Sequence, residues 1–342
     1  MSCLVTGATG NVGSLVTQRL IDRGDRPCVF VRDPKKAREL FGDRVEVRVG
    51  DLADISSALA GISDVFLLNS GPDLEVRDRA AAFSAKTAGV RHLVKLSTLD
   101  VSTGVGTGSW HARGEHAVRE SGVSFTFIRS SAFMSNALSW ADTIKSEGVL
   151  RTSTGNGKIA FIHPADIADV AVKALTTRAH DGEELVITGP QALTYGEMAS
   201  RIGAVIGKTI RFEQISDEEA RPNFDRAYAD ALVDIWRAIR EDRLATVTDG
   251  VHKSSDANPS PSINGRKQTP EPSGVPARLE ASEGSLHGVL PHRRGRNRGT
   301  PLRDAVHERF DHVRQDEQHP LRRCDAFEGL PKCPAKTQRA FG

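Results

Sequence analysis

The stretch that most constrains this chain is its first turn, SCLVTGATGNVG over residues 2–13. A short apolar run leads into three evenly spaced glycines, Gly7, Gly10 and Gly13, and an amphipathic segment follows them. We expect a strand, a tight turn and a helix. In this turn Gly7 takes a positive φ, Gly10 admits a pyrophosphate, and Gly13 lets the helix pack closely on the strand. The free N–H groups and dipole at the helix start then face the phosphates, so the turn predicts nucleotide binding.

Short apolar runs continue to alternate with helical segments as far as about residue 130. Such runs are typical of parallel strands that are buried on both faces, which predicts a Rossmann-type, doubly wound α/β sheet. Ligands of these sheets bind beyond the C-terminal ends of the strands. We therefore expect one binding edge that collects the residues following strands one to five, namely Gly7, Arg32, Asp51, Ser70 and Ser97.

The pattern divides the chain into three segments. Residues 1–132 are expected to form the NAD(P)-binding core, and 133–250 a smaller mixed α/β substrate lobe that partly returns to the core sheet. Residues 251–342 carry 16 Lys plus Arg against 11 Asp plus Glu, are rich in Pro, and show no hydrophobic period. We interpret them as a disordered or aberrant tail. A frameshifted or read-through extension from about residue 252 is favoured over a basic tail that contacts nucleic acid through HRRGRNR.

Composition bears on three properties of the protein: nucleic-acid binding, metal binding and membrane contact. The net charge is +2, so the whole molecule is not an evident nucleic-acid binder. The four cysteines lack metal-binding spacing, and Cys3 and Cys28 fall in expected strands, so no metal is predicted. No apolar run has the length needed to cross a bilayer, and the first strand leaves no room for a signal peptide, which predicts a cytoplasmic protein without membrane contact.

The end of the second strand bears on the choice of cofactor. An acidic residue at this point accepts from the ribose 2′-hydroxyl, whereas a basic one accommodates a 2′-phosphate. Arg32 leaves the strand first and Lys36 follows within a turn, so NADP(H) is favoured over NAD(H). Asp33 argues the opposite way, although it also suits the N-cap of a helix with Pro34 at its first position. Asp51, after the third strand, suits either an adenine contact or a helix cap.

Several motifs in order carry a family resemblance: TGATGNVG, VRDPKKA, GDLAD, KLST, HARGEHAVRESGVSFTFIR, FMSN, HPADIADVA and ITGPQALTYGEMA. Over roughly residues 1–250 the chain resembles the NmrA-like branch of the atypical short-chain dehydrogenase/reductase superfamily, which includes type 2 NAD(P)H:quinone oxidoreductases and ergot-alkaloid reductases. The resemblance implies a pyrophosphate site at the first turn, a 2′-phosphate site, a nicotinamide-ribose site and a loop that borders a small-molecule substrate. These expectations fall, in that order, on Gly7, Thr9, Gly10, Asn11, Val12 and Gly13; on Arg32 and Lys36; on Ser70 and Gly71; and on Phe133, Met134 and Asn136.

The chain departs from the wider superfamily at the catalytic pair. Ordinary members carry Tyr-x-x-x-Lys on the helix after the fifth strand, whereas this chain has His111-x-x-x-Glu115 and its two tyrosines, Tyr195 and Tyr228, lie far downstream. We favour an NADP(H)-dependent oxidoreductase that passes hydride to a quinone-like or conjugated acceptor. The alternative is a non-catalytic NADP(H) sensor of NmrA type that acts through a protein partner. A sugar-nucleotide or isoprenoid-modifying relative that holds NAD tightly is also open, as is the oligomeric state.

Each catalytic candidate has a plainer interpretation beside it. His111 is expected to be a proton donor or an orienting hydrogen bond, because an imidazole changes charge near neutral pH. It can equally be a surface histidine paired with Glu115. Ser97 either faces the nicotinamide or satisfies backbone groups. Asn136 contacts substrate or caps the next helix, and Asp166 is expected to cap the helix that runs to Leu175.

Overall fold

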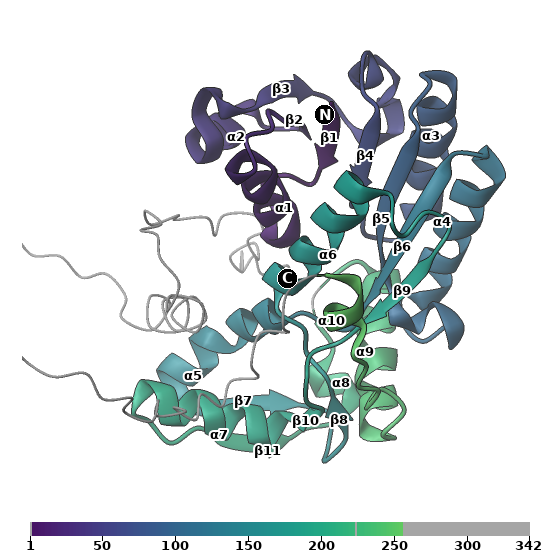
Figure 1. The fold of residues 1–342 in the computed structure, drawn as a ribbon. Helices are drawn as coiled ribbons and strands as arrows, with labels where there is room; N and C mark the ends of the chain where they lie inside the picture. Colours follow the sequence, from purple (N-terminus) through teal and green to yellow (C-terminus); the bar gives the residue numbers. More distant parts are fainter. Residues whose placement is uncertain (1, 223, 256–342) are drawn as a thin grey trace, which may run out of the picture.

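The computed structural model describes residues 2–222 and 224–255, so the expectations for residues 256–342 lie outside the described part. Its centre is a seven-stranded sheet in the order β3-β2-β1-β4-β5-β6-β9, with every neighbouring pair parallel (Figure 1). This order confirms the predicted Rossmann-type α/β fold. The strands are β1 Cys3–Thr6, β2 Cys28–Val31, β3 Glu46–Val49, β4 Asp64–Leu67, β5 His92–Thr98, β6 Ser124–Ser130 and β9 Glu184–Ile187.

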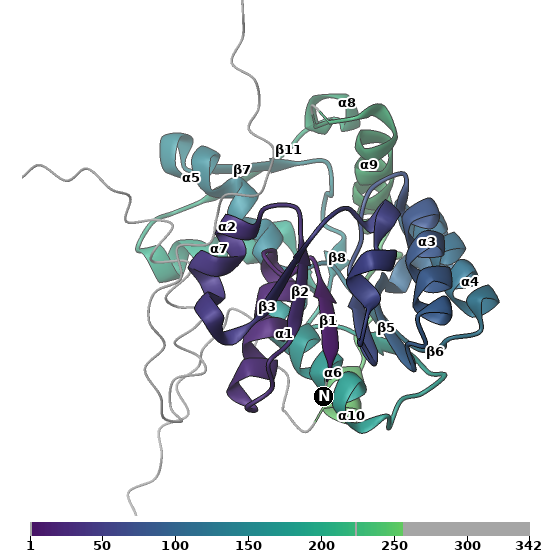
Figure 2. The ribbon, with the colours of Figure 1, turned by 90° about the horizontal axis from the view of Figure 1, so that it is seen from above.

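Two hydrophobic layers cover the sheet because successive strand residues point to opposite faces. In β1, Val5 packs with the helices of one face, whereas its neighbour Leu4 packs with those of the other. Figure 2 shows α3 and α4 beside each other on their face of the sheet. The first face carries α1 Asn11–Asp22, α2 Pro34–Phe41, α6 Pro164–Thr177 and α10 Gly250–Ser254; the second carries η3 Ser56–Leu59, α3 Leu74–Thr87 and α4 Gly108–Ser121.

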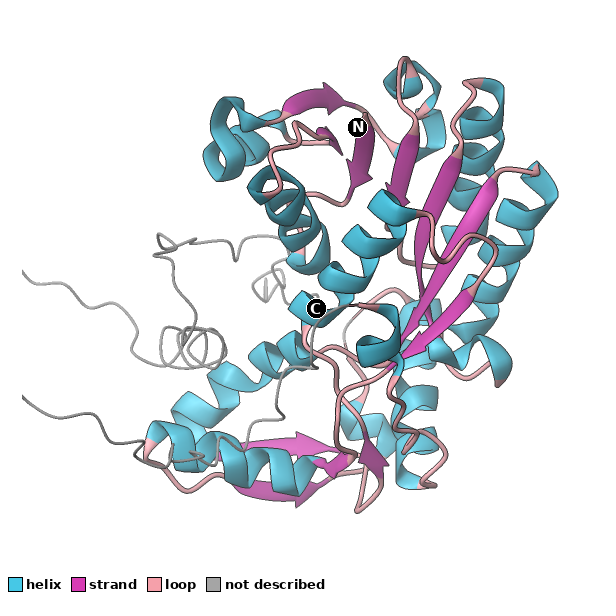
Figure 3. Ribbon diagram, viewed as in Figure 1, coloured by secondary structure: helices cyan, strands magenta, loops and turns pink. Residues whose placement is uncertain are grey.

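A smaller lobe lies below the sheet in the view of Figure 3 and has a hydrophobic core of its own. Two short sheets build it, one from the parallel pair β7 Val149–Thr152 and β11 Arg211–Gln214, the other from the antiparallel pair β8 Lys158–Ile159 and β10 Leu193–Thr194. Its helices are η5 Met134–Trp140, α5 Ala141–Glu147, α7 Tyr195–Ile206, α8 Asp217–Ala220 and α9 Arg226–Arg240. The remaining short helices of the described part are η1 Gly42–Arg44, η2 Leu52–Asp54 and η4 Leu99–Ser102.

The structure corrects two local expectations. The cap of α6 is His163, whose Nδ1 accepts from the N–H of Ala165 at 3.1 Å, and Asp166 lies inside the helix instead. The folded part also extends past the boundary predicted at residue 250. Helix α10 packs on α6 and β9, with Val251 1% exposed and Gly250 so close to Val186 that a Cβ would lie 2.0 Å from the carbonyl oxygen.

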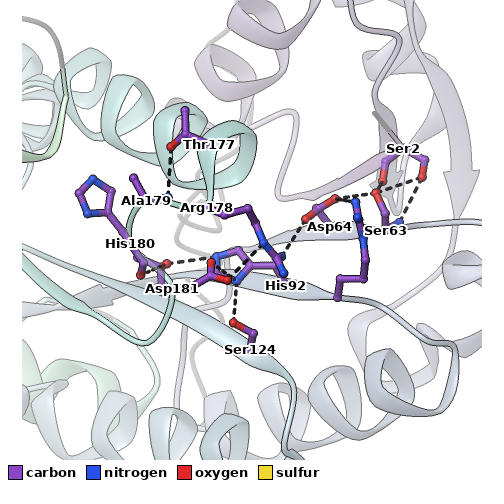
Figure 4. A network of polar contacts seen from close by, with 12 residues as sticks. Ser2, Ser63, Asp64, His92, Ser124, Thr177, Arg178, Ala179, His180 and Asp181 are labelled. Carbon is purple, nitrogen blue, oxygen red and sulfur yellow. Dashed lines mark hydrogen bonds and ion pairs between the residues drawn. The ribbon is translucent and has the colours of Figure 1, made fainter.

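A polar network occupies the N-terminal ends of the central strands, opposite the expected binding edge (Figure 4). The Asp64 carboxylate accepts a hydrogen bond from Ser63 Oγ at 2.5 Å. It also lies 3.3 Å from the guanidinium of Arg91 and 3.4 Å from that of Arg178. His92, which begins β5, lies with its Nδ1 3.1 Å from an oxygen of Asp181. These contacts tie the starts of β4 and β5 to the end of α6. Among the described helices, none has the length and apolar character required to cross a membrane.

Candidate functional site

The first turn has the geometry that its glycines predict. Gly7 has φ 62°, and the N–H of Gly10 donates to its carbonyl oxygen at 3.0 Å. A Cβ on Gly13 would lie 2.2 Å from the same oxygen, so only glycine allows α1 to approach β1 this closely. Gly10 caps α1 without any side-chain hydrogen bond, which leaves the first-turn N–H groups to a ligand. Thr9 is half-buried and Asn11 is exposed, whereas the side chain of Val12 packs in the hydrophobic core. These residues fit a bound pyrophosphate.

The end of β2 separates its two candidate cofactor residues. One oxygen of Asp33 accepts from the N–H of Lys35 at 2.9 Å, so this carboxylate is the N-cap of α2. Arg32 is exposed, and no residue of the described part forms an ion pair or hydrogen bond with its guanidinium. Lys36 lies half-buried on the first turn of α2. Asp51 accepts from the N–H of Ala53 at 3.0 Å and therefore acts as the cap of η2.

The loop after β4 is held by helix α3. Gly71 has φ 99°, a conformation that favours glycine. The backbone N–H of Ser70 donates to Asn69 Oδ1 at 2.9 Å, and Arg77 Nη2 donates to the carbonyl oxygen of Ser70 at 2.8 Å. Asn69 Nδ2 in turn donates to Asp78 at 3.2 Å. Asn69, Arg77 and Asp78 were not predicted as parts of this site, because hydrophilic residues in a loop and a helix carry no distinctive signal.

Ser97 and Glu115 form a buried network between β5 and α4. Ser97 Oγ donates to Glu115 Oε1 at 2.7 Å, and Arg129 of β6 donates to both oxygens of the same carboxylate, at 3.0 and 2.6 Å. Arg129 also lies 2.5 Å from Glu184 of β9. Ser97 thus faces the helix layer, and the Glu115 carboxylate joins β5, α4 and β6. Glu115 is engaged with these partners rather than with His111.

His111 lies on the first turns of α4, and its Nδ1 is buried without a hydrogen-bond partner in the described part of the chain. Burial lowers the pKa of His111 well below its usual range, and the positive charge of Lys95 lowers it further. A lowered pKa runs against the expectation that this imidazole changes charge near neutral pH. His111 is a neutral ring at pH 7, which offers one hydrogen-bond donor and one acceptor.

The loop that is predicted to border the substrate, residues 133–136, contacts the glycine turn at the start of α1. Asn11 Nδ2 donates to Ser135 Oγ at 3.2 Å, which joins residues 124 positions apart. Phe133 is half-buried and bridges to Ile162, and the N–H of Met134 donates to the Ile162 carbonyl oxygen at 2.8 Å. Asn136 is exposed inside η5, whose N-cap is Phe133, so Asn136 is not the expected helix cap.

Two groups of aromatic side chains pack near this loop and near His111. Trp140 lies 5.2 Å from Tyr195 and 6.3 Å from Phe161, measured between ring centroids, within the core of the small lobe. Trp110, the neighbour of His111, lies 6.1 Å from Tyr228 of α9. Tyr228 lies far downstream of α4 in the sequence, and the packing of α9 brings it next to Trp110. Within residues 2–222 and 224–255, no three His, Cys, Asp or Glu side chains are grouped to hold a metal ion.

Comparisons with known proteins agree with this arrangement. Residues 7–178 match a family model described as NAD(P)H-binding. The chain is 42% identical over 224 residues to a (4-alkanoyl-5-oxo-2,5-dihydrofuran-3-yl)methyl phosphate reductase of Streptomyces griseus, covering 64% of this chain and 78% of the relative. It is 36% identical over 268 residues to an NAD(P)H azoreductase of Xenophilus azovorans, covering 73% and 91%.

A solved structure gives the same result in three dimensions. The NADPH-dependent quinone oxidoreductase of Escherichia coli, complexed with NADPH, superimposes with a TM-score of 0.70 at 26% identity. The match covers 77% of this chain and 97% of that chain. These findings confirm the resemblance to NmrA-like reductases that the sequence motifs indicate.

Proposed function

The chain belongs to the NAD(P)H-binding family and is an oxidoreductase, and from this premise we propose that it transfers hydride from NADPH to a conjugated small molecule. The acceptor class is a quinone or an unsaturated carbonyl compound. The observation that carries the proposal is His111, a half-buried imidazole with a lowered pKa and a buried, unpaired Nδ1, at the place where ordinary superfamily members carry a catalytic tyrosine. The names of the quinone, azo and unsaturated-lactone reductases similar to this chain support the same class.

Three parts of the chain bind the cofactor in this proposal. The first-turn N–H groups of α1 bind the pyrophosphate, Arg32 with Lys36 binds the 2′-phosphate, and Ser70 with Gly71 borders the nicotinamide ribose. The preference for NADPH is supported by the contrast between Arg32, whose guanidinium is exposed and unpaired in the described part, and Asp33, which is engaged as a cap. Asp51 lies where an adenine contact is expected, although its carboxylate caps η2.

Bound NADPH supplies the hydride, and the residues of the chain orient the acceptor. Neutral His111 donates a hydrogen bond to the oxygen that becomes negative, while Phe133 and Met134 border the acceptor and Asn136 lies at its exposed rim. Delocalisation stabilises the oxyanion that forms from a quinone or an unsaturated carbonyl compound, so it takes its proton from water. A saturated ketone gives a localised alkoxide that needs a stronger acid, and the Tyr-x-x-x-Lys pair that supplies one is absent from α4.

A panel of acceptors tests this chemistry. Purified protein is mixed with NADPH and a benzoquinone, a naphthoquinone, an unsaturated lactone, an azo dye or a saturated ketone, and oxidation of NADPH is followed by its absorbance. We expect turnover with one or more conjugated acceptors and none with the ketone. Binding of NADPH without oxidation by any acceptor would overturn the proposal and favour the non-catalytic sensor.

Substitution of Arg32→Ala tests the cofactor preference. Loss of a charge-assisted contact to the 2′-phosphate is expected to raise the Kd for NADPH by roughly tenfold or more and to leave the Kd for NADH unchanged. Lys35→Ala is the matched control, because Lys35 lies three residues after Arg32, on the first turn of α2, with its side chain 82% exposed. Unchanged NADPH affinity in the Arg32 variant would remove the case for a 2′-phosphate site.

A further inference from the structure

An ion pair is buried beneath the loop that follows β4. Lys95 Nζ lies 2.6 Å from Asp78 Oδ2, and both side chains are 0% exposed. Lys95 belongs to β5, otherwise apolar at its centre, and Asp78 belongs to α3. Gly114 of α4 makes room for the carboxylate, because a Cβ there would lie 2.3 Å from Asp78 Oδ2. Such pairs are often no more stabilising than apolar residues of similar size, so stability alone does not account for this one.

The pair connects to the loop through Asn69. Its Nδ2 donates to Asp78 Oδ1 at 3.2 Å and to the carbonyl oxygen of Leu74 at 3.1 Å. Its Oδ1 accepts from the N–H of Ser70 at 2.9 Å. Both polar ends of the buried amide are thereby used, and the orientation of the amide is determined by Asp78. The Ser70 peptide is therefore held by Asn69, which is itself held by the ion pair.

The neighbouring residue of α3 holds the loop from the other side. Arg77 Nη2 donates to the carbonyl oxygen of Ser70 at 2.8 Å and lies against Gly71. Two consecutive residues of one helix thus fix both sides of a short loop that includes a glycine with φ 99°. Preordering matters because a loop that must be ordered by its ligand weakens the observed affinity.

We propose that Asp78 and Lys95 are positioning residues for the nicotinamide half of the cofactor, acting through Asn69 on the backbone of Ser70 and Gly71. Lys95 holds the carboxylate, Asp78 orients the amide, and the amide fixes the loop. The inference rests on the proposed function, which puts the nicotinamide ribose beside Ser70 and Gly71. It predicts an effect confined to ligands that contain the nicotinamide half.

The test compares the binding of NADPH with that of 2′,5′-ADP, which carries the adenosine and the 2′-phosphate but no nicotinamide. Asn69→Ala removes the amide and leaves the ion pair intact. The double variant Asp78→Leu with Lys95→Met removes the anchor of the amide without leaving an unpaired buried charge. The double variant Asp78→Asn with Lys95→Met is also uncharged but keeps an oxygen that accepts from Asn69. Glu75→Gln is the control, because Glu75 lies three residues before Asp78 on α3 and forms a half-exposed ion pair with Arg113 of α4.

The Asn69→Ala and Asp78→Leu/Lys95→Met variants are expected to bind NADPH about tenfold more weakly, the effect of about one lost hydrogen bond, and 2′,5′-ADP unchanged. The Asp78→Asn/Lys95→Met variant is expected to recover NADPH affinity to within about twofold, and Glu75→Gln to match the wild type. Thermal unfolding of each variant identifies any that fails to fold, in which case Asn69→Ala decides.

Wild-type NADPH affinity in Asn69→Ala would overturn the inference, as would an equal loss for NADPH and 2′,5′-ADP. Failure of the Asp78→Asn/Lys95→Met variant to recover more than the Asp78→Leu/Lys95→Met variant would also count against it. The proposed function fails by a different result, namely tight NADPH binding by the wild type without turnover of any acceptor. The binding comparison would still decide the role of Asp78 and Lys95 in that event.

Discussion

The two halves of the cofactor site are built in different ways. The proposed diphosphate half is a contiguous turn that offers backbone N–H groups and carries three glycines, which lack Cβ atoms. The proposed acceptor half rests on buried polar side chains of β5, α3, α4 and β6 that are far apart in sequence and hold these elements together. A backbone site depends on local geometry, whereas a side-chain site depends on packing across the whole domain. We therefore expect substitutions in the two halves to differ in their effects on stability and on NADPH affinity.

The largest effect is expected from Arg129→Met in the acceptor half. The substitution leaves the fully buried Glu115 without its bidentate partner, and breaking a buried pair of this kind costs about 3–5 kcal/mol of unfolding free energy. Urea unfolding measures this loss. Arg113→Met removes a half-exposed arginine from α4, the helix that carries Glu115. This variant should lose about 1 kcal/mol of unfolding free energy or less. Equal stability losses in the two variants would show that the acceptor half does not depend on its buried network.

An intermediate effect on stability is expected from Gly13→Ala in the diphosphate half. The new Cβ would meet the Gly7 carbonyl oxygen, so the turn must shift at a cost of roughly 1–3 kcal/mol. The shift displaces the N–H groups that bind phosphate, and NADPH affinity should fall by more than about tenfold. Gly196→Ala in α7 is the control, since its Cβ would have no neighbour closer than 3.7 Å. Wild-type NADPH affinity in the Gly13 variant would contradict the backbone account of this half.

The smallest effect is a pH dependence that belongs to the acceptor half and to β5. Burial lowers the pKa of His111, with Lys95 adding to the effect, and burial also lowers the pKa of His92 against the opposing charge of Asp181. Unfolded histidines gain a proton below pH about 6.5, which the folded ones resist, so stability is full above that pH and falls as the pH drops.

The expected loss is roughly 1 kcal/mol per histidine between pH 6.5 and 5.5, measured as the change in urea-unfolding free energy. Replacement of His111→Asn should reduce the pH dependence relative to the wild type, because one buried neutral imidazole is removed. An unchanged slope, or stability that rises on acidification, would be inconsistent with a neutral His111.

The sequence predicts the core of the fold well and the small lobe less well. Short apolar strands and glycine turns carry their own signals, and the parallel seven-stranded sheet agrees with the Rossmann-type fold predicted from them. The strand β7 was not predicted, because VLRT over residues 149–152 is short and pairs with β11 about 60 residues later. Such pairings depend on contacts that no local pattern reports.

The same distinction applies to the site. The glycine turn was predicted from contiguous residues, and its geometry agrees. The neutral state of His111 was not predictable, since it follows from burial and from Lys95 on another element. The structural role of Ser97 depends likewise on Glu115 and Arg129. The roles of Lys36, Phe133, Met134 and Asn136 toward ligands stay predictions.

The central claim is that hydride leaves NADPH and reaches a conjugated acceptor on this protein. The most direct measurement is a single-turnover reaction with NADPH carrying deuterium at the transferred position and an unsaturated lactone as acceptor, followed by mass spectrometry of the products. The account predicts a saturated lactone with one deuterium on the carbon β to the carbonyl and a slower rate than with unlabelled NADPH. Bound NADPH that retains its deuterium with no reduced product, for this lactone and for the quinones alike, would contradict it.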